Sequence, residues 1–146
     1  MKVALTGITG FVGQNLLPMI VKQCQDVEIL TLNIPPDLQK AKELYPYANC
    51  QHILTSDLAK LKEFNPEVAL HLATVTTERN DTDIIRPMLS ANIEFGVLLL
   101  DVLKDCSNFK LFVNTGTFAE YRLGTGEIND AYLYAATKSA FRHFCD

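Results

Sequence analysis

The chain has 146 residues, of which 48% are hydrophobic and 21% charged, and its formal net charge is −4. This length suffices for one domain with a core, and the composition is that of a soluble globular protein. No block of like charges occurs, so the clustered lysine and arginine that a nucleic-acid partner requires are missing. Apolar runs such as residues 97–100 are far too short to cross a membrane. We therefore expect neither nucleic acid nor a membrane as a partner.

The four cysteines, Cys24, Cys50, Cys106 and Cys145, lie far apart, without a CxxC pair and without a histidine at metal-ligand spacing. This pattern is typical of reduced thiols, and it predicts no metal site. No secretory apolar segment precedes the first predicted strand. We expect a cytoplasmic protein.

Strand-like and helical patterns alternate along the chain. The predicted strands are residues 3–6, 27–32, 52–54, 68–73 and 111–114, and the predicted helices are residues 11–24, 38–44, 57–65, 87–105 and 130–146. Residues 74–86 are expected to form a polar loop, and Asp57 is placed to cap the third helix. This alternation predicts a doubly wound α/β (Rossmann) fold, a parallel sheet with right-handed crossovers and strand order 3-2-1-4-5.

A glycine-rich turn, TGITGFVG at residues 6–13, joins the first predicted strand to the first predicted helix. Gly7 permits the tight turn, Gly10 lets backbone N–H groups approach a pyrophosphate, and Gly13 lets the helix lie close to the strand. The N-terminus of the helix offers unpaired donors and the positive end of its dipole to phosphates. In this strand–turn–helix context the turn predicts a dinucleotide site.

Tyr134 and Lys138 form a YxxxK motif inside the last predicted helix, where a spacing of four places both side chains on one face. A phenol with an unperturbed pKa near ~10 is a poor base at neutral pH unless a cation stabilises its anion. The lysine one turn away provides that cation, so the pair predicts a tyrosine that exchanges a proton with a substrate oxygen.

These motifs together resemble the extended short-chain dehydrogenases/reductases, the NAD-dependent epimerase/dehydratase family that modifies nucleotide-sugars. The resemblance runs in order through the TGxxGxxG turn, Asp57-Leu58, the segment 71–74 with sequence HLAT, Asn92, and the YxxxK motif. The cofactor-binding residues that it implies are Gly7, Thr9, Gly10, Phe11, Val12, Gly13, Asn33, Asp57, Leu58, Leu72, Ala73, Thr74, Asn92, Thr115, Tyr134 and Lys138.

The resemblance also implies a catalytic hydroxyl just past the fifth strand. Counting back from Tyr121, taken as the tyrosine that ends the family's turn, places this hydroxyl at Thr117, with Thr115 as the alternative. Phe118 and Ala119 stand where the family's 4,6-dehydratases carry an Asp-Glu pair. The expected activity is therefore that of a nucleotide-sugar epimerase or 4-keto-reductase with Thr117, Tyr134 and Lys138 as catalytic residues.

The cofactor is either NAD or NADP, because the acidic residue that family members place after the second strand to bind the ribose is replaced by Asn33. Asp37 follows a few residues on, and Lys40 and Lys42 are near enough to meet a 2′-phosphate. Neither cofactor is excluded by charge.

Family members continue past the YxxxK helix into a substrate-binding domain, which is absent from residues 1–146. We expect the chain to be one NAD(P)-binding Rossmann domain, truncated after this helix, whose substrate is a nucleotide-sugar in the complete enzyme. The alternative is a non-catalytic NAD(P)-binding sensor or interaction module. The helices at 87–105 and 130–145 are apolar on more than one side, which predicts a homodimer through them.

Overall fold

The computed structural model describes residues 1–79, 81–121 and 132–145. The chain forms two compact units, one of residues 1–73 with 101–113 and the other of residues 74–100 with 114–146. In the described ranges, no helix is long and apolar enough to cross a membrane.

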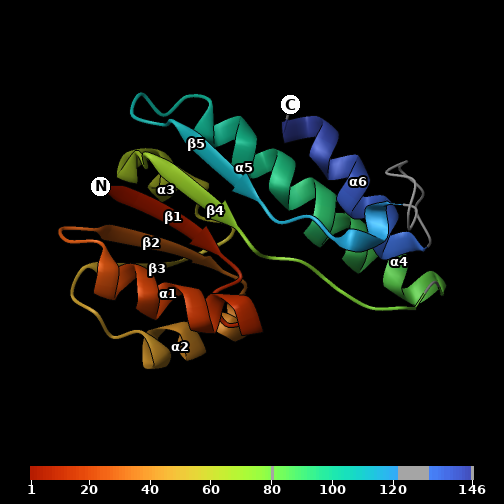
Figure 1. Ribbon diagram of the computed structural model, residues 1–146, viewed down its shortest axis with the longest axis horizontal. Helices are drawn as coiled ribbons and strands as arrows, with labels where there is room; N and C mark the ends of the chain where they lie inside the picture. The colour runs from red at the N-terminus through yellow and green to blue at the C-terminus, as the bar shows by residue number, and fades with distance from the viewer. Residues whose placement is uncertain (80, 122–131, 146) are drawn as a thin grey trace. The chain divides into compact units, whose positions relative to one another are not determined.

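The first unit is built on a parallel sheet. Its strands are β1 (Lys2–Thr6), β2 (Glu28–Asn33), β3 (Cys50–Leu54), β4 (Val68–His71) and β5 (Leu111–Asn114). They lie in the order β3-β2-β1-β4-β5 (Figure 1). The central strand β1 pairs in parallel with both neighbours, so that Val3 lies opposite Ile29 on one side and Val68 on the other. The predicted doubly wound sheet and its strand order are confirmed.

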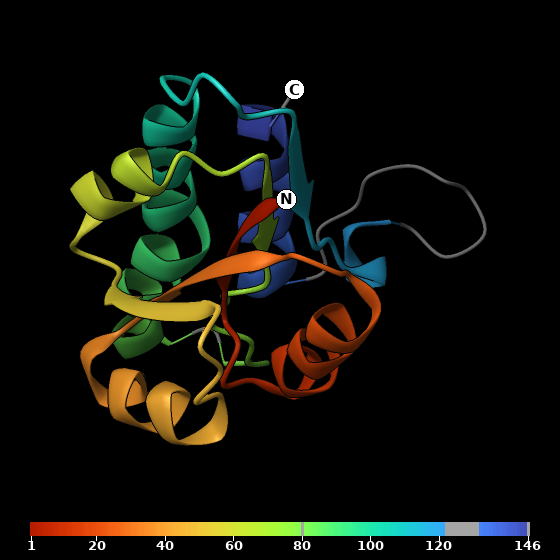
Figure 2. The same cartoon turned by 90° about the vertical axis from the view of Figure 1, so that its left-hand side faces the viewer.

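Helices cover both faces of this sheet. α1 (Phe11–Gln23) and α2 (Pro35–Leu44) lie on one face, and α3 (Leu58–Phe64) lies on the other (Figure 2). Side chains alternate along a strand, so one set of β1 and β2 residues faces the first two helices. The buried cluster on that face consists of Val3, Leu5, Ile8, Leu17, Val27, Ile29, Ala41 and Tyr45.

Two expectations about these helices are wrong in detail. α2 begins at Pro35 rather than near residue 38, because Pro35 and Pro36 occupy its first positions, where a missing N–H costs nothing. Asp57 precedes α3 at the predicted capping position, but its side chain makes no cap hydrogen bond. Its backbone (φ −91, ψ 46) is outside the extended region that a capping residue adopts, and its carboxylate pairs instead with Lys60.

The second unit is helical apart from its connections. It contains α4 (Thr82–Leu89), a π-helical turn η1 (Ser90–Glu94), the start of α5 (Phe95–Leu103), a 3-10 turn η2 (Phe118–Glu120) and α6 (Leu133–Cys145). α6 packs against α4, η1 and η2. The buried side chains of this unit include Met88, Leu99, Ala135 and Phe141.

The helix predicted at residues 87–105 begins earlier than expected. It starts at Thr82, after Asp81 in an extended conformation, so that part of the predicted loop 74–86 is helical. Pro87 therefore lies inside α4 rather than in its first turn, and it removes one backbone donor there. The π-helical turn follows directly after α4. The predicted start of the last helix, at residue 130, lies outside the described residues.

One hydroxyl group ties the carboxyl ends of β1 and β4 together. The Thr6 Oγ1 accepts hydrogen bonds from the backbone N–H groups of Leu72 (3.1 Å) and Ala73 (3.0 Å). It also lies 2.9 Å from Nδ1 of His71, whose side chain is 1% exposed. Because the oxygen already accepts two bonds, its own proton is available to Nδ1 of His71.

Replacing Thr6 with valine should destabilise the first unit. Thr6→Val keeps the shape but leaves the Leu72 and Ala73 N–H groups and His71 Nδ1 without their partner, at a cost of about 1–3 kcal/mol. Urea unfolding followed by circular dichroism measures this loss. Thr6→Ser, which keeps the hydroxyl, should lie closer to the parent chain, and equal stability of Thr6→Val and the parent would contradict the role of the hydroxyl.

Candidate functional site

The glycine turn between β1 and α1 is shaped by two close backbone approaches. Gly7 adopts φ +70, and a Cβ on it would lie 2.6 Å from the backbone nitrogen of Ala73. A Cβ on Gly13 would lie 2.4 Å from Cα of Ile8. A side chain fits at neither position, so both glycines are required by the fold of the turn itself.

Gly10 differs from these two glycines. Its backbone (φ −78, ψ 171) suits any residue, and an added Cβ would meet one neighbouring atom, the carbonyl oxygen of Gly7, at 3.3 Å. The space beside Gly10 is thus not filled by protein in the first unit. A single tight contact with a backbone oxygen explains a glycine here only in part, and the close approach of a ligand to the backbone is a further reason for it.

α1 begins at this open position without the usual side-chain cap. Gly10 is its N-cap residue, no side chain bonds the first-turn N–H groups, and the first turn contains no acidic residue. Phe11 and Val12 are 86% and 55% exposed although they are apolar. The N-terminus of α1 therefore presents unpaired donors and a positive dipole end, which together can hold phosphate oxygens.

A carboxylate lies beside the same turn. The Thr9 hydroxyl donates to Oδ2 of Asp37 at 2.9 Å, and Lys40 Nζ donates to the Thr9 carbonyl at 3.4 Å. Asn33 is 4% exposed, and its amide group donates to Oγ1 of Thr31 (2.9 Å) and to the carbonyl of Ile53 (3.3 Å). The donors of Asn33 are thus used within the sheet, and Asp37 is the acidic group nearest the turn.

The other residues of the first unit that were predicted to bind the cofactor contact residues of the same unit. The N–H groups of Leu72 and Ala73 bind Thr6, and the Asp57 carboxylate binds Lys60 at 2.9 Å. Leu58 is the half-buried first residue of α3. The roles of Asp57, Leu58, Leu72 and Ala73 toward a cofactor stay predictions.

Asn92 organises the second unit from inside the π-helical turn η1. Its side chain is 1% exposed. Its Oδ1 accepts bonds from the Val75 N–H (2.7 Å) and the Thr74 hydroxyl (3.0 Å). Its Nδ2 donates to the Val75 carbonyl and to Oγ1 of Thr137, both at 3.0 Å. All four hydrogen-bonding capacities of the amide are used, so Asn92 holds the segment after β4 and α6 together, and its contact with a cofactor stays a prediction.

Thr117 lies in a closed turn just after β5. Its backbone N–H donates to Oε1 of Glu120 at 2.7 Å, and its Oγ1 accepts from the Ala119 N–H at 3.4 Å. This is a capping box, in which residues three apart satisfy each other's donors. Glu120 was not among the predicted site residues, although the Thr-x-x-Glu spacing at 117–120 is the sequence signal of such a box. Thr115, the alternative hydroxyl, is half-buried before this turn.

Tyr134 and Lys138 lie one turn apart on α6, as expected from their spacing. Tyr134 is half-buried and Lys138 is 2% exposed. Burial lowers the pKa of Lys138 from its usual value, because the ammonium loses its hydration, while the negative charge of Glu120 opposes this shift. A tyrosine beside a buried cation can exchange a proton with a bound hydroxyl or carbonyl group. No group of three potential metal ligands occurs among the described residues.

The chain matches a family of known proteins. The model of the NAD dependent epimerase/dehydratase family matches residues 3–146. The chain is similar to CDP-abequose synthase of Yersinia pseudotuberculosis, with 23% identity over 148 residues that cover 100% of this chain and 50% of the relative.

Solved structures share the fold. The UDP-glucuronic acid 4-epimerase of Bacillus cereus, in complex with UDP-glucuronic acid and NAD, is 25% identical with a TM-score of 0.75 over 99% of this chain and 51% of that chain. The Bordetella bronchiseptica enzyme WbmH, in complex with NAD+, is 20% identical with a TM-score of 0.78 over 98% of this chain and 50% of that chain. The chain spans about half the length of these relatives. By its match over residues 3–146, the chain belongs to the NAD-dependent epimerase/dehydratase family.

Proposed function

We propose that this chain is the NAD-binding and proton-transfer part of a nucleotide-sugar epimerase or 4-keto-reductase. The observation that carries the proposal is the uncapped N-terminus of α1 behind the open position at Gly10. The NAD in the Bacillus cereus and Bordetella bronchiseptica structures supports it, as does the nucleotide-sugar in the former.

The first unit holds the dinucleotide. The N–H groups that follow Gly10 meet the pyrophosphate, and Phe11 and Val12 lie exposed beside it. Asp37 favours NAD over NADP, because a carboxylate accepts hydrogen bonds from a ribose hydroxyl but repels a 2′-phosphate. Lys40, whose ammonium donates to the Thr9 carbonyl, acts in the opposite direction, because a cation attracts a 2′-phosphate.

The second unit supplies the proton transfer. Tyr134 takes a proton from a sugar hydroxyl or gives one to a keto group, Lys138 stabilises its anionic form, and the Thr117 hydroxyl donates to the same substrate oxygen. Bound nicotinamide supplies or receives the hydride. Epimerisation or keto-reduction needs only these groups, and the side chains of Phe118 and Ala119 carry no proton that dehydration could use.

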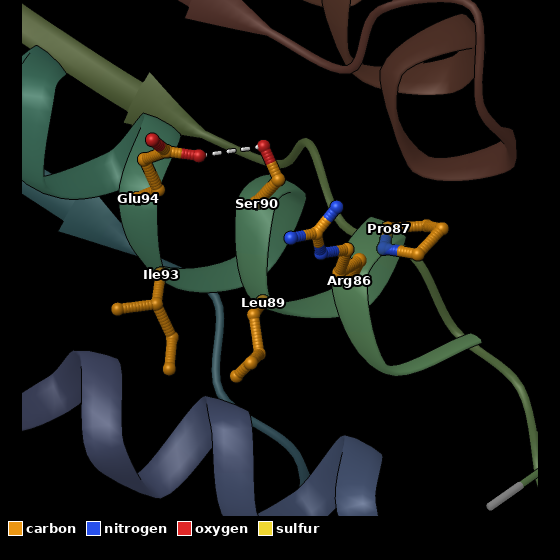
Figure 3. Close-up of a pocket in the computed structure, with 6 residues that line it drawn as sticks. All are labelled: Arg86, Pro87, Leu89, Ser90, Ile93 and Glu94. Atoms are coloured by element: carbon orange, nitrogen blue, oxygen red, sulfur yellow. Dashed lines mark hydrogen bonds between the residues drawn. The ribbon is translucent and has the colours of Figure 1, made fainter. Parts of the chain in front are cut away.

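We also propose a homodimer through α4, η1, α5 and α6, which include the helices predicted at residues 87–105 and 130–145. On α4, Ile85 is 38% exposed and Leu89 is 40% exposed. Leu98 on α5 is 49% exposed, and Phe144 on α6 is 55% exposed. Leu89 and Ile93 project from the same side of the helix and line a pocket (Figure 3). A self-complementary apolar face of this kind suits a two-fold interface. The proposed cytoplasmic location is supported by the spacing of the four cysteines, which contain no CxxC pair.

The glycine turn predicts a variant that loses binding while keeping its fold. Gly10→Val places methyl groups where the backbone meets pyrophosphate, so NAD affinity should fall at least about tenfold, or ~1.4 kcal/mol. Calorimetric titration with NAD measures the affinity, and circular dichroism monitors the fold. Gly13→Ala is the contrasting variant, because its Cβ collides with Ile8 and should disrupt the fold. Equal NAD affinity in the parent and in Gly10→Val would be evidence against the placement.

The proton-transfer role predicts that Tyr134→Phe slows turnover. The loss should be about a hundredfold or more, the usual scale for one general acid/base, with NAD affinity little changed. The assay uses a protein that also contains a substrate-binding half, with UDP-, dTDP-, CDP- and GDP-sugars. Tyr132→Phe is the matched control, since the two rings lie 6.0 Å apart. Turnover of Tyr134→Phe at the parent rate would contradict the assigned role of Tyr134, whereas a parent protein without turnover would favour the non-catalytic alternative. Comparing Thr117→Val with Thr115→Val identifies the hydroxyl.

The dimer is tested with a charge on the proposed face. Leu89→Glu should convert a dimer into a monomer in light scattering, because it places a carboxylate in the apolar interface. Leu111→Glu, at an exposed leucine of β5, controls for nonspecific association. A monomeric parent, or dissociation by Leu111→Glu alone, would rule out the proposed interface.

A further inference from the structure

Two opposite charges are buried in the second unit. Glu120 on η2 and Lys138 on α6 are each 2% exposed, and η2 packs against α6. Burial of a carboxylate or an ammonium is costly unless hydrogen bonds or an opposite charge compensate it. The family's reaction chemistry, as implied by the sequence motifs, uses Lys138 and leaves Glu120 without a role.

The contacts of Glu120 fix the turn that carries Thr117. Oε1 of Glu120 accepts the Thr117 N–H at 2.7 Å. The same oxygen lies so close to Gly116 that a Cβ there would be 3.0 Å away, so Gly116 leaves the room that the carboxylate occupies. The Thr117 Oγ1 accepts the Ala119 N–H, which leaves the hydroxyl proton to donate outward. The carboxylate therefore determines where the Thr117 hydroxyl lies.

The charge of Glu120 also acts on Lys138. Burial lowers the pKa of Lys138, and the two groups that raise it are the Glu120 carboxylate, from η2, and Cys145, on α6 itself. On η1, the group that bonds α6 is the amide of Asn92, which is neutral and donates to Thr137. Of the two groups that raise the pKa of Lys138, Glu120 has the larger effect, and it favours the charged lysine.

We propose that Glu120 is a positioning residue, whose buried carboxylate both anchors the Thr117 turn and balances the charge of the Lys138 ammonium. Its consequence for catalysis rests on the proposed function. There, the charged lysine stabilises the anion of Tyr134, and the anchored Thr117 hydroxyl meets the same substrate oxygen. One carboxylate links the two otherwise separate parts of the machinery, the turn after β5 and the YxxxK helix.

The first test needs no substrate. Glu120→Gln keeps an oxygen for the Thr117 N–H but removes the charge, so the pKa of Lys138 should fall below that of the parent chain. NMR titration of isotopically labelled lysine side chains measures it. Glu94→Gln is the matched control, because it removes one exposed carboxylate of the same unit and should leave Lys138 unchanged. An unchanged Lys138 titration in Glu120→Gln would overturn the proposal.

A second measurement uses the parent chain and therefore does not depend on the folding of a variant. Deprotonation of Lys138 should also shift the amide resonance of Thr117, because the Glu120 carboxylate contacts that N–H and is polarised by the lysine charge. Titration of Lys138 without any response at Thr117 would contradict the link.

Kinetics then separate positioning from a purely structural role. In an active protein, Glu120→Gln should lower kcat with little change in KM. The alkaline fall of kcat should move to lower pH, because the lysine loses its charge earlier. An unaltered pH profile in Glu120→Gln would contradict the effect of Glu120 on Lys138. A parent protein without turnover would instead contradict the proposed function, and the two NMR measurements would then test the interaction between Glu120 and Lys138.

Discussion

The first unit depends on the close approach of two backbones at the carboxyl ends of β1 and β4. Gly7 lies so near Leu72 and Ala73 that no Cβ fits, and the Thr6 hydroxyl bonds both of their N–H groups and His71. This contact sets where the chain leaves β1, and hence the direction in which α1 begins. The open N-terminus of α1 exists because the turn before it is fixed by packing and needs no capping side chain.

A comparable constraint holds the second unit together. Asn92 uses every hydrogen bond that its amide can make to join residues 74–75 to Thr137 on α6. Asn92 lies in a π-helical turn, and such turns are frequent at functional sites. The wider backbone of the turn changes the direction of a side chain. The neighbouring residues of α6, among them Lys138, are thereby held in register with η1.

Buried charge is a third feature on which the structure depends. Lys138 on α6 is 2% exposed. Its burial is tolerated because the carboxylate of Glu120, also 2% exposed, lies on the turn η2, which packs against α6. The arrangement stabilises one form of the helix and the turn, since movement of either would leave an uncompensated charge in a low-dielectric environment. Such a pair costs stability relative to apolar packing, and it is kept where the charge itself is useful.

The sequence by itself determined the alternation of elements, the strand order, the glycine turn and the spacing of Tyr134 and Lys138, because hydrophobic periodicity and glycine chemistry are local signals. It misplaced the starts of α2 and α4, because the position of a helix end depends on which backbone groups find partners. Only the tertiary structure showed that Thr9 binds Asp37, that the amide of Asn92 is used in internal bonds, and that Glu120 and Lys138 are both buried on elements that pack together. Burial and long-range hydrogen bonds arise when distant segments pack together, and no local pattern in the sequence contains them.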